Sequence, residues 1–257
     1  MKTMWMCSVA FMLASVGMGA PANAQFPTMI PAPATLPEEG GSVTVDIRLP
    51  YDGFVMLEEH EIPSPRFFGV ERAGERVDMT RFVRLISSRR ENRWRIMFDL
   101  DTPGTHMLIL EPTAQFESDV EKMATYYTKA FTQIGGAGEW QHPAGLPFEI
   151  VPLDNPVAHA VAHPFEARLI LDGAPVSEAV RIGRAVDEPE SYETDAASAQ
   201  EVKANEDGIF RFTPDRPGWW RLVAVVVTDD LMDSPDGDPV PLKYGAVLWL
   251  HVAGAME

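Results

Sequence analysis

Three stretches of the chain carry histidine or carboxylate side chains at spacings that could hold a cation. The first is Glu58-Glu59-His60-Glu61, in a long acidic connection near the start of the chain. Carboxylate oxygens and imidazole nitrogens suit borderline divalent metals such as nickel, cobalt, zinc or copper. Consecutive residues of an extended chain cannot all face one ion, so at most two of the four would bind it. The alternative interpretation is an exposed acidic loop.

The other two stretches are a histidine pair and an aspartate cluster. His159 and His163 share one face of either a helix or a strand, because they are four residues apart. Pro164 follows directly, which favours a loop that enters a strand. The cluster resembles a calcium loop only loosely, since it lacks the ordered ligand spacing of one, and a solvated hairpin loop explains it better. Its members are Asp229, Asp230, Asp233, Asp236 and Asp238.

No arrangement of residues points to catalysis. The chain lacks a Gly-x-Ser-x-Gly nucleophile motif and a glycine loop for phosphate. Acidic residues are so frequent that no pair stands out as a general acid and base. We therefore predict that the protein is not an enzyme. Four tryptophans could form a platform for a sugar, but neighbours in a strand face opposite sides, so most are expected in the core: Trp140, Trp219, Trp220 and Trp249.

The first 24 residues have the pattern of an export signal. Lys2 supplies a positive start, an apolar stretch follows, and Ala22-Asn23-Ala24 is a cleavage signal, so the mature chain is expected to begin at Gln25. The apolar stretch is too short to span a bilayer, which predicts no stable membrane insertion. The single cysteine, Cys7, lies inside the signal. The mature protein is therefore expected to fold by core packing alone, without a disulfide.

The charge of the chain is strongly negative. Lys and Arg number 21 against 38 Asp and Glu, a formal net charge of −17, and removal of the signal with Lys2 makes it more negative still. This balance argues against nucleic acid and against anionic membrane surfaces as partners, because both are bound by basic patches. An acidic surface also keeps an exported protein in solution.

The elements that must position these residues are short strands. Residues 42–49 alternate polar and apolar side chains, and residues 94–100 are apolar at every even position, the period of a half-buried strand. Runs rich in β-branched and aromatic residues at 219–227 and 244–252 predict two more strands. Residues 118–134 fit both a helical stripe and a strand, and we favour a strand after a loop. Residues 25–41 read as an extended lead-in along a sheet edge.

The fold class expected from this pattern is all-β, with two β-sandwich domains of immunoglobulin-like or carboxypeptidase-regulatory-like type. Short strands separated by turn signals about every 8–12 residues are typical of such domains. The glycine-rich run at 135–138 and the crossing segment that follows it place the boundary near Gly145. We predict a signal peptide at 1–24, an amino-terminal sandwich at 25–145 and a carboxy-terminal sandwich at 146–257.

Several motifs together resemble a family of exported bacterial proteins with a domain of unknown function, described as the periplasmic component of ABC-type cobalt or nickel transport. The likeness spans nearly the whole mature chain, and the last two long runs are the most specific. It implies two β domains in a Gram-negative periplasm, a non-enzymatic role and a membrane metal-uptake transporter as partner. The motifs are Gln25-Phe26-Pro27-Thr28-Met29-Ile30-Pro31, Pro65-Arg66-Phe67-Phe68-Gly69-Val70, Tyr127-Thr128-Lys129, Pro217-Gly218-Trp219-Trp220, Gly145-Leu146-Pro147-Phe148-Glu149-Ile150-Val151-Pro152-Leu153 and Gly245-Ala246-Val247-Leu248-Trp249.

The resemblance also implies a metal site, and this chain departs from it. Members commonly have histidine where this sequence has Gln25, near Asp52 and at Tyr126. Three soft or borderline ligands are thereby replaced at once, which lowers the expected affinity for nickel or cobalt. The candidate metal ligands are Asp52, Tyr126 and Gln25, followed by His60, with His159 and His163 as further replacements.

Two functions follow from the sequence. One is a soluble periplasmic binding or accessory protein related to cobalt and nickel uptake, with a divalent transition metal such as nickel or cobalt as its ligand. The other is a β-sandwich interaction module that binds a partner protein or a glycan through its acidic loops or exposed tryptophans. A metal titration distinguishes them.

Overall fold

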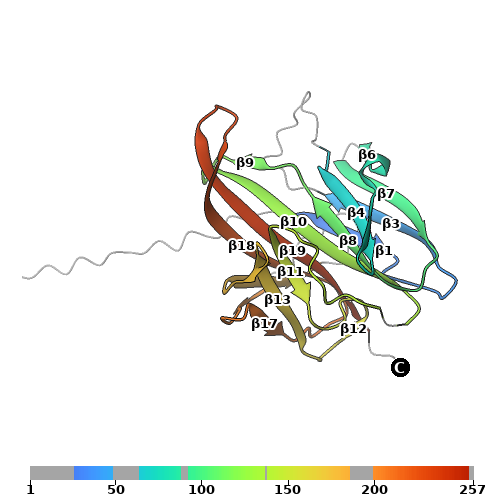
Figure 1. Ribbon diagram of the computed structural model, residues 1–257. Helices are drawn as coiled ribbons and strands as arrows, with labels where there is room; N and C mark the ends of the chain where they lie inside the picture. Colours follow the sequence, from blue (N-terminus) through green and yellow to red (C-terminus); the bar gives the residue numbers. More distant parts are fainter. Residues whose placement is uncertain (1–25, 49–63, 88–91, 137, 186–198, 255–257) are drawn as a thin grey trace, which may run out of the picture.

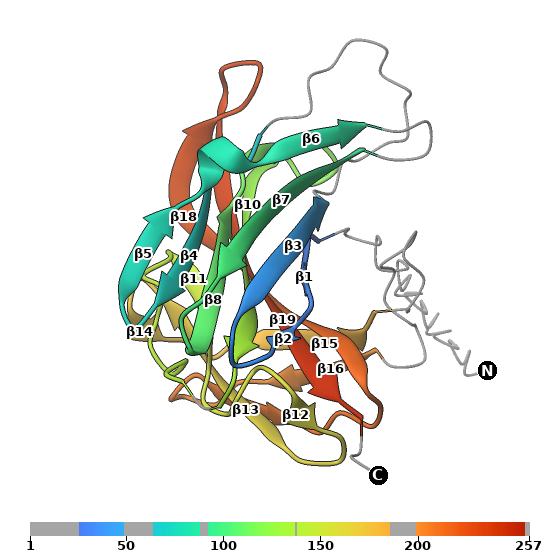
Figure 2. The same cartoon turned by 90° about the vertical axis from the view of Figure 1, so that its right-hand side faces the viewer.

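The computed structural model describes residues 26–48, 64–87, 92–136, 138–185 and 199–254, and within these ranges the protein is built from β-strands and one short 3-10 helix, η1 (Thr80–Phe82). The predicted all-β fold class is therefore confirmed. Three sheets stack in layers, as Figures 1 and 2 show from two sides.

The middle layer is an eleven-stranded sheet, here called the central sheet. Its long strands stand side by side, and three short strands, β12 (His159–Ala160), β2 (Thr35–Leu36) and β9 (Gln115–Glu117), pair with β19 or β10 off the main path. The main path runs through β16 (Gln200–Lys203), β15 (Ala179–Arg184), β18 (Gly218–Asp233), β19 (Pro239–Ala253), β10 (Lys122–Ile134), β8 (Gly104–Glu111), β4 (Phe67–Arg72) and β5 (Glu75–Asp78).

The outer layers are two four-stranded sheets. The amino-terminal sheet has the order β1 (Thr28–Ala32), β3 (Gly41–Arg48), β7 (Asn92–Leu100) and β6 (Arg84–Ser87). The carboxy-terminal sheet has the order β11 (Phe148–Pro152), β13 (Phe165–Leu171) and β14 (Ala174–Pro175), with β17 (Ile209–Phe212) paired to β13. β1 is an edge strand that pairs antiparallel with β3, as expected for the lead-in.

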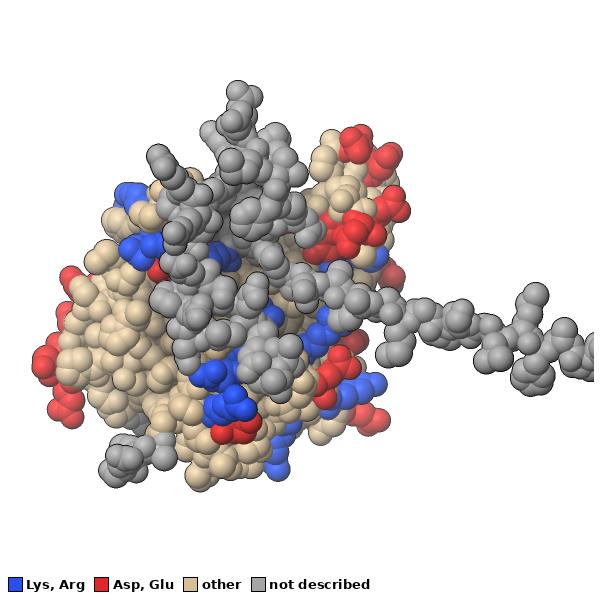
Figure 3. All heavy atoms as spheres, turned by 180° about the vertical axis from the view of Figure 1, so that it is seen from behind, with Lys and Arg blue, Asp and Glu red and all other residues tan. Residues whose placement is uncertain are grey.

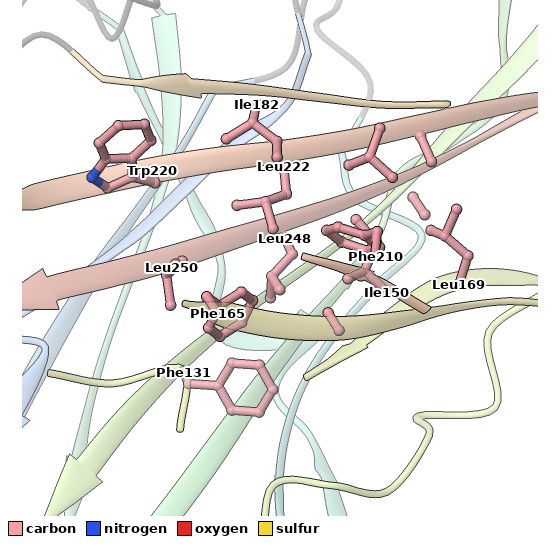
Figure 4. Packing of buried hydrophobic residues seen from close by; sticks show 14 of the residues in the cluster. Phe131, Ile150, Phe165, Leu169, Ile182, Phe210, Trp220, Leu222, Leu248 and Leu250 are labelled. Carbon is pink, nitrogen blue, oxygen red and sulfur yellow. The ribbon is translucent and has the colours of Figure 1, made fainter. Parts of the chain in front are cut away.

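Each face of the central sheet covers its own hydrophobic core. On β8, Met107 and Ile109 face the carboxy-terminal sheet, whereas Leu108 and Leu110 face the amino-terminal sheet. This alternation follows from the two-residue period of a strand. Figure 4 shows the first core, where Phe131 of β10 packs with side chains of the carboxy-terminal sheet and of β18 and β19. Two sandwiched cores exist, as predicted, and they share one sheet.

β10 explains why residues 118–134 were ambiguous in the sequence. From Ala124 to Ile134 every residue is buried, because both faces of the strand are covered. A strand buried on both faces loses the polar–apolar alternation that identifies a half-buried one. The favoured prediction of a strand that follows a loop is confirmed, since β10 begins at Lys122.

The central sheet connects the two halves of the chain. β10 pairs in parallel with β19, in a register that runs from Met123 opposite Leu242 to Lys129 opposite Leu248. Both cores contain residues from before and after position 145. The boundary near Gly145 stays a prediction about where the chain divides in sequence, and the central sheet runs across it.

β18 and β19 form a long two-stranded ribbon that projects beyond the rest of the sheet (Figure 1). β15 pairs with β18 only up to Ala224, and β10 pairs with β19 only from Leu242 onward. The acidic stretch at 229–241 was expected to be a loop, and this was wrong: β18 continues to Asp233 and β19 begins at Pro239. A bulge between Val227 and Leu231 lengthens β18 relative to β19.

Among the described residues no helix is long and apolar enough to cross a membrane.

Candidate functional site

Of the four predicted metal ligands, only Tyr126 belongs to the described residues. Gln25, Asp52 and His60 lie outside them. Tyr126 stands on β10, and its side chain is buried against the core between the central and amino-terminal sheets. The phenol therefore sits in the position that the resemblance assigns to a metal ligand, and its neighbours decide what it can bind.

The phenol oxygen of Tyr126 already has a strong partner. Its hydroxyl donates a hydrogen bond to Oε1 of Glu117 at 2.5 Å, and Lys243 Nζ lies 2.5 Å from Oε2 of the same carboxylate. The Lys243 ammonium also stands 5.5 Å from the centre of the Tyr126 ring. A carboxylate that receives an ammonium and a hydroxyl is well satisfied, so this phenol is not free to bind a cation without breaking a charge-assisted bond.

The start of the described chain packs against this tyrosine. The ring of Phe26 meets the ring of Tyr126 edge-on, with the centroids 5.3 Å apart. The guanidinium of Arg221 lies 5.1 Å from the centre of the Phe26 ring, and Trp249 Nε1 donates to the carbonyl of Pro27 at 3.1 Å. Burial lowers the pKa of Arg221 to about 10. The contact between Phe26 and Tyr126 thus ties the first described residue to β10.

We call Phe26, Glu117, Tyr126, Arg221 and Lys243 the amino-terminal corner. The Tyr126 hydroxyl and the Lys243 ammonium share the carboxylate of Glu117 within it. Among the described residues, no three histidine, cysteine, aspartate or glutamate side chains lie close enough together to hold a metal ion. A nickel or cobalt site at Gln25, Asp52, His60 and Tyr126 stays a prediction, because three of these four residues lie outside the described chain.

The two histidines of the 159–163 stretch are not brought together as ligands. Nε2 of His159 lies 3.1 Å from the backbone carbonyl of His163, and Nδ1 of His163 lies 3.1 Å from the carbonyl of Val161. The ring of His159 also meets the ring of Phe165 edge-on. His163 lies in the loop that enters β13, in agreement with the prediction, whereas His159 lies in the short strand β12.

The aspartate cluster is spread along the ribbon rather than gathered around one point. Asp229, Asp230 and Asp233 belong to β18, whereas Asp236 and Asp238 belong to the turn. The turn is closed by its own bonds, since Ser234 N donates to Asp238 O at 2.8 Å and Gly237 N donates to Ser234 O at 2.9 Å. No calcium loop forms here.

A buried ion pair was missed in the sequence. Nζ of Lys129 on β10 lies 2.5 Å from Oε2 of Glu149 on β11, and both side chains are 1% exposed. Glu149 also accepts backbone N–H bonds from Ala144 and Gly145, at 2.8 and 2.9 Å. Burial lowers the pKa of Lys129, and the carboxylate of Glu149 opposes this shift. The pair fixes the segment that leads from β10 into the carboxy-terminal sheet.

A second polar group lies beside this pair. The carboxylate of Glu71 bonds to Arg76 at 2.6 Å and to Nε2 of His142 at 2.8 Å. Arg76 in turn donates to the carbonyl of Ala144 at 2.5 Å. Each of these side chains therefore has a partner inside the protein. The Lys129–Glu149 pair had a signal in the sequence, because the Tyr-Thr-Lys and Gly-Leu-Pro-Phe-Glu motifs contain these two residues.

The tryptophans do not form a sugar platform. Trp220 and Trp249 are each 1% exposed, and Trp220 belongs to one core whereas Trp249 belongs to the other. Trp219 packs on the ring of His251, with the centroids 5.0 Å apart. The prediction that at least one of the adjacent pair Trp219 and Trp220 lies in the core is confirmed.

The layered sheets define a β-sandwich protein. A family model for a domain of unknown function, DUF4198, matches residues 22–228. The chain belongs to this family. A comparison with curated protein sequences gave no match.

Solved structures with a similar arrangement are distant. Dimeric latent PorU from Porphyromonas gingivalis is 9% identical with a TM-score of 0.26, and the match covers 93% of this chain and 21% of PorU. The chain thus spans about a fifth of the length of PorU. A chimeric titin Z1Z2 is 13% identical with a TM-score of 0.24, covering 90% of this chain and 98% of that one. The fibronectin(III)-like modules of Clostridium thermocellum CbhA are 7% identical with a TM-score of 0.21, covering 90% and 95%.

Proposed function

We propose that the protein is an exported, non-enzymatic accessory protein that acts by binding another protein at its surface. The observation that carries this proposal is the ribbon of β18 and β19, on which Leu231 and Met232 are exposed although they are large and apolar. Large apolar side chains that are exposed on a projecting ribbon, outside any core, favour an interaction surface. By contrast, the side chains of Glu71, Tyr126 and Lys129 have partners within the chain.

Export to the periplasm is part of this proposal. It rests on the sequence of residues 1–24, with a positive start, an apolar stretch and an Ala-x-Ala cleavage signal. Mass spectrometry of the protein recovered from the periplasm tests it. A first residue of Gln25 supports export by cleavage, and an intact amino terminus contradicts it.

A second candidate function is favoured by one specific contact. Phe26 packs on Tyr126, the tyrosine that the resemblance assigns to a metal site. The expected first residue of the mature chain, Gln25, directly precedes Phe26 in the sequence. Gln25, Asp52, His60 and Tyr126 would then hold nickel or cobalt, and a membrane metal-uptake transporter would be the partner. For this to occur, Tyr126 must give up its bond to Glu117.

Calorimetric titration separates the two functions. Metal-free mature protein is titrated with Ni²⁺, Co²⁺, Cu²⁺ and Zn²⁺. We expect no saturable heat with any of the four, since the Tyr126 hydroxyl is already bonded to Glu117. A saturable one-to-one heat with Ni²⁺ or Co²⁺ that is lost in the Tyr126→Phe variant would establish the metal function instead. Glu206→Gln, on a distant exposed turn, is the matched control.

A further inference from the structure

The hydrogen-bond pattern at the end of the ribbon shows which backbone groups point out of it. Ser234 N donates to Asp238 O at 2.8 Å, so these two residues form a hydrogen-bonded pair of the ladder. Hydrogen-bonded and non-bonded pairs alternate along an antiparallel ladder. The next pair, Asp233 opposite Pro239, is therefore non-bonded. The backbone groups of such a pair point away from the partner strand, toward the two outer edges of the ribbon.

The outer edge of β19 lacks hydrogen-bond donors in this region. Pro241 stands opposite Leu231, two positions along the ladder from Pro239, so both prolines occupy non-bonded pairs. Proline has no backbone N–H, and neither residue can donate to a strand laid beside β19. This edge is therefore closed to strand addition.

The outer edge of β18 keeps its donors. The backbone N–H and C=O groups of Leu231 and Asp233 point outward, because both residues belong to non-bonded pairs. Within the described residues, β15 pairs with β18 only as far as Ala224, and no other strand pairs with β18 beyond that point on this side. An incoming strand would find donors and acceptors here at every second residue.

The side chains along this edge alternate between two faces of the ribbon. Leu231 and Asp233 point to one face, whereas Met232 points to the other with Val240, its neighbour on β19. Leu231 and Met232 are 61% and 41% exposed. One face of the edge thus combines a carboxylate with an apolar side chain, and the opposite face is apolar.

The charge of the ribbon limits which strand can pair with this edge. Five aspartates occur between residues 229 and 238, and no lysine or arginine occurs in residues 222–242. The three on β18, Asp229, Asp230 and Asp233, are exposed. Figure 3 shows acidic side chains gathered on the projecting end of the molecule. A second copy of β18 would bring aspartates against aspartates, which is destabilising, whereas a basic strand would be attracted.

We propose that the edge of β18 at Leu231 and Asp233 receives an extended segment of a partner protein in which basic and apolar residues alternate. This inference rests on the proposed function and names how the partner is held. The backbone of the segment pairs with β18, its basic side chains lie on the face of Asp233, and its apolar side chains lie on the face of Met232. A lysine on the first face can cover Leu231 with its stem while its ammonium reaches a carboxylate. In this mode the main chain supplies affinity and alternate side chains supply specificity.

A nuclear magnetic resonance titration of the mature chain with a synthetic peptide of alternating lysine and valine tests the proposal. The amide signals of Leu231 and Asp233 should shift, and their hydrogens should exchange more slowly with solvent, because they become hydrogen-bonded. A peptide with the same residues in two blocks has equal charge but cannot present lysine on one face only, so it should bind more weakly. Absence of binding by the alternating peptide, or equal binding by the block peptide, overturns the proposal.

Two substitutions at Leu231 separate backbone pairing from charge. Leu231→Pro removes the outward N–H and leaves every aspartate and the ladder with β19 in place, as Pro241 does on the facing strand. It should weaken binding of the alternating peptide by about 5-fold or more, because a peptide carbonyl loses its donor. Leu231→Val keeps the N–H and should bind like the unchanged chain. Circular dichroism checks folding, and a folded Leu231→Pro variant with full affinity would show attraction by charge alone and refute strand addition.

A pair of neutral variants tests the charge of the edge without changing its backbone. Asp230→Asn with Asp233→Asn should lower the affinity for the alternating peptide about 2-fold to 30-fold, because two pairs of opposite charge on adjacent strands are lost. The control, Glu206→Gln with Asp207→Asn, neutralises two exposed carboxylates on a turn of the carboxy-terminal half and should leave the affinity unchanged. Equal losses in the two double variants would mean that the whole acidic surface attracts the peptide, against the proposal.

Sedimentation of the mature chain alone tests the other occupant of this edge. We expect the mass of one copy, since the aspartates of two ribbons repel each other. A mass of two copies that Leu231→Pro abolishes would assign the edge to a second copy and refute the basic partner. The metal titration is independent of these results: saturable nickel binding that is lost in Tyr126→Phe contradicts the proposed function, whereas a silent titration without peptide binding contradicts only the strand addition.

Discussion

At the scale of single residues, Gly245 shows how one missing side chain decides the packing around Tyr126. A Cβ atom at position 245 would lie 2.1 Å from Cδ1 of the tyrosine ring, and the two residues stand opposite each other in the pairing of β10 with β19. The space occupied by the ring therefore requires glycine here, independently of backbone conformation. This accounts for the first residue of the Gly-Ala-Val-Leu-Trp run.

The substitution Gly245→Ala should lower the free energy of unfolding by about 1–3 kcal/mol, since it overpacks a closely filled site. Urea denaturation measures the change. Gly254→Ala is the matched control, because a Cβ there meets nothing within 4 Å. Equal stability of the two variants would show that the Tyr126 ring can move aside without cost.

A second prediction at this scale concerns His251. Burial lowers the pKa of its imidazole below the usual 6.5, and Nδ1 is buried without a hydrogen-bond partner in the described chain. Between the folded pKa and about 6.5, the unfolded chain binds more protons than the folded one, so stability is lost as the pH falls. Buried His106, whose pKa is also lowered by burial, acts in the same direction.

The melting temperature should therefore fall between about pH 7.5 and about pH 5. His251→Phe keeps a ring against Trp219 and removes the titrating group, so its melting temperature should depend less on pH over this range. Thermal melts at a series of pH values measure both curves. A variant with an unchanged or steeper pH dependence would exclude His251 as a source of the acid sensitivity.

At the scale of elements, β10 determines how the layers are joined. It is covered on both faces and pairs with β8 on one side and with β19 on the other. Lys129 extends from it to Glu149 of β11, which ties the central sheet to the carboxy-terminal sheet. Two motifs that are separate in sequence are thus two halves of one buried contact.

The substitution Lys129→Met should destabilise the fold by about 3–5 kcal/mol, because it leaves the Glu149 carboxylate buried without its cation. Denaturant unfolding at neutral pH measures the loss. Arg181→Met, which breaks an exposed pair with Glu201, should cost no more than about 1 kcal/mol. Comparable losses in the two variants would contradict the structural role of the buried pair.

The strands with clear alternation were predictable from the sequence, and the contacts between them were not. Residues 42–49 and 94–100 have one buried and one open face, so their period identifies them as β3 and β7. The ribbon was missed because its tip buries no apolar side chain, and aspartates and prolines are common turn residues. The parallel pairing of β10 with β19 joins residues more than a hundred positions apart, which no local pattern reveals.

The candidate site was predictable only in part for a similar reason. The resemblance pointed to Tyr126, but its partners Glu117 and Lys243 come from different elements. Only the sheet order brings Lys243 of β19 beside β10. The chemistry of the corner therefore depends on long-range pairing.

At the scale of the whole molecule, the shared central sheet makes the two halves depend on each other. Residues 25–145 alone would lack β18 and β19, which cover one side of β10, and residues 146–257 alone would lack β10 and β8. Each half would expose an open sheet edge and apolar side chains of both cores.

Neither half should therefore fold when it is produced alone, and the complete mature chain should unfold in a single transition. Circular dichroism melts of the fragments 25–145 and 146–257 and of the whole chain test this. Cooperative melting of either fragment would instead show an independent domain and support the boundary near Gly145.

The parallel pairing of β10 with β19 has a consequence for biogenesis. β19 follows every other described strand in sequence. β10 therefore cannot form its pairing with β19 until β19 has been synthesised. In this interval β10 exposes an unpaired strand edge, which is prone to aggregation. Pairing between strands that are far apart in sequence is also slow. A holdase that shields β10 before release would therefore raise the yield of native protein.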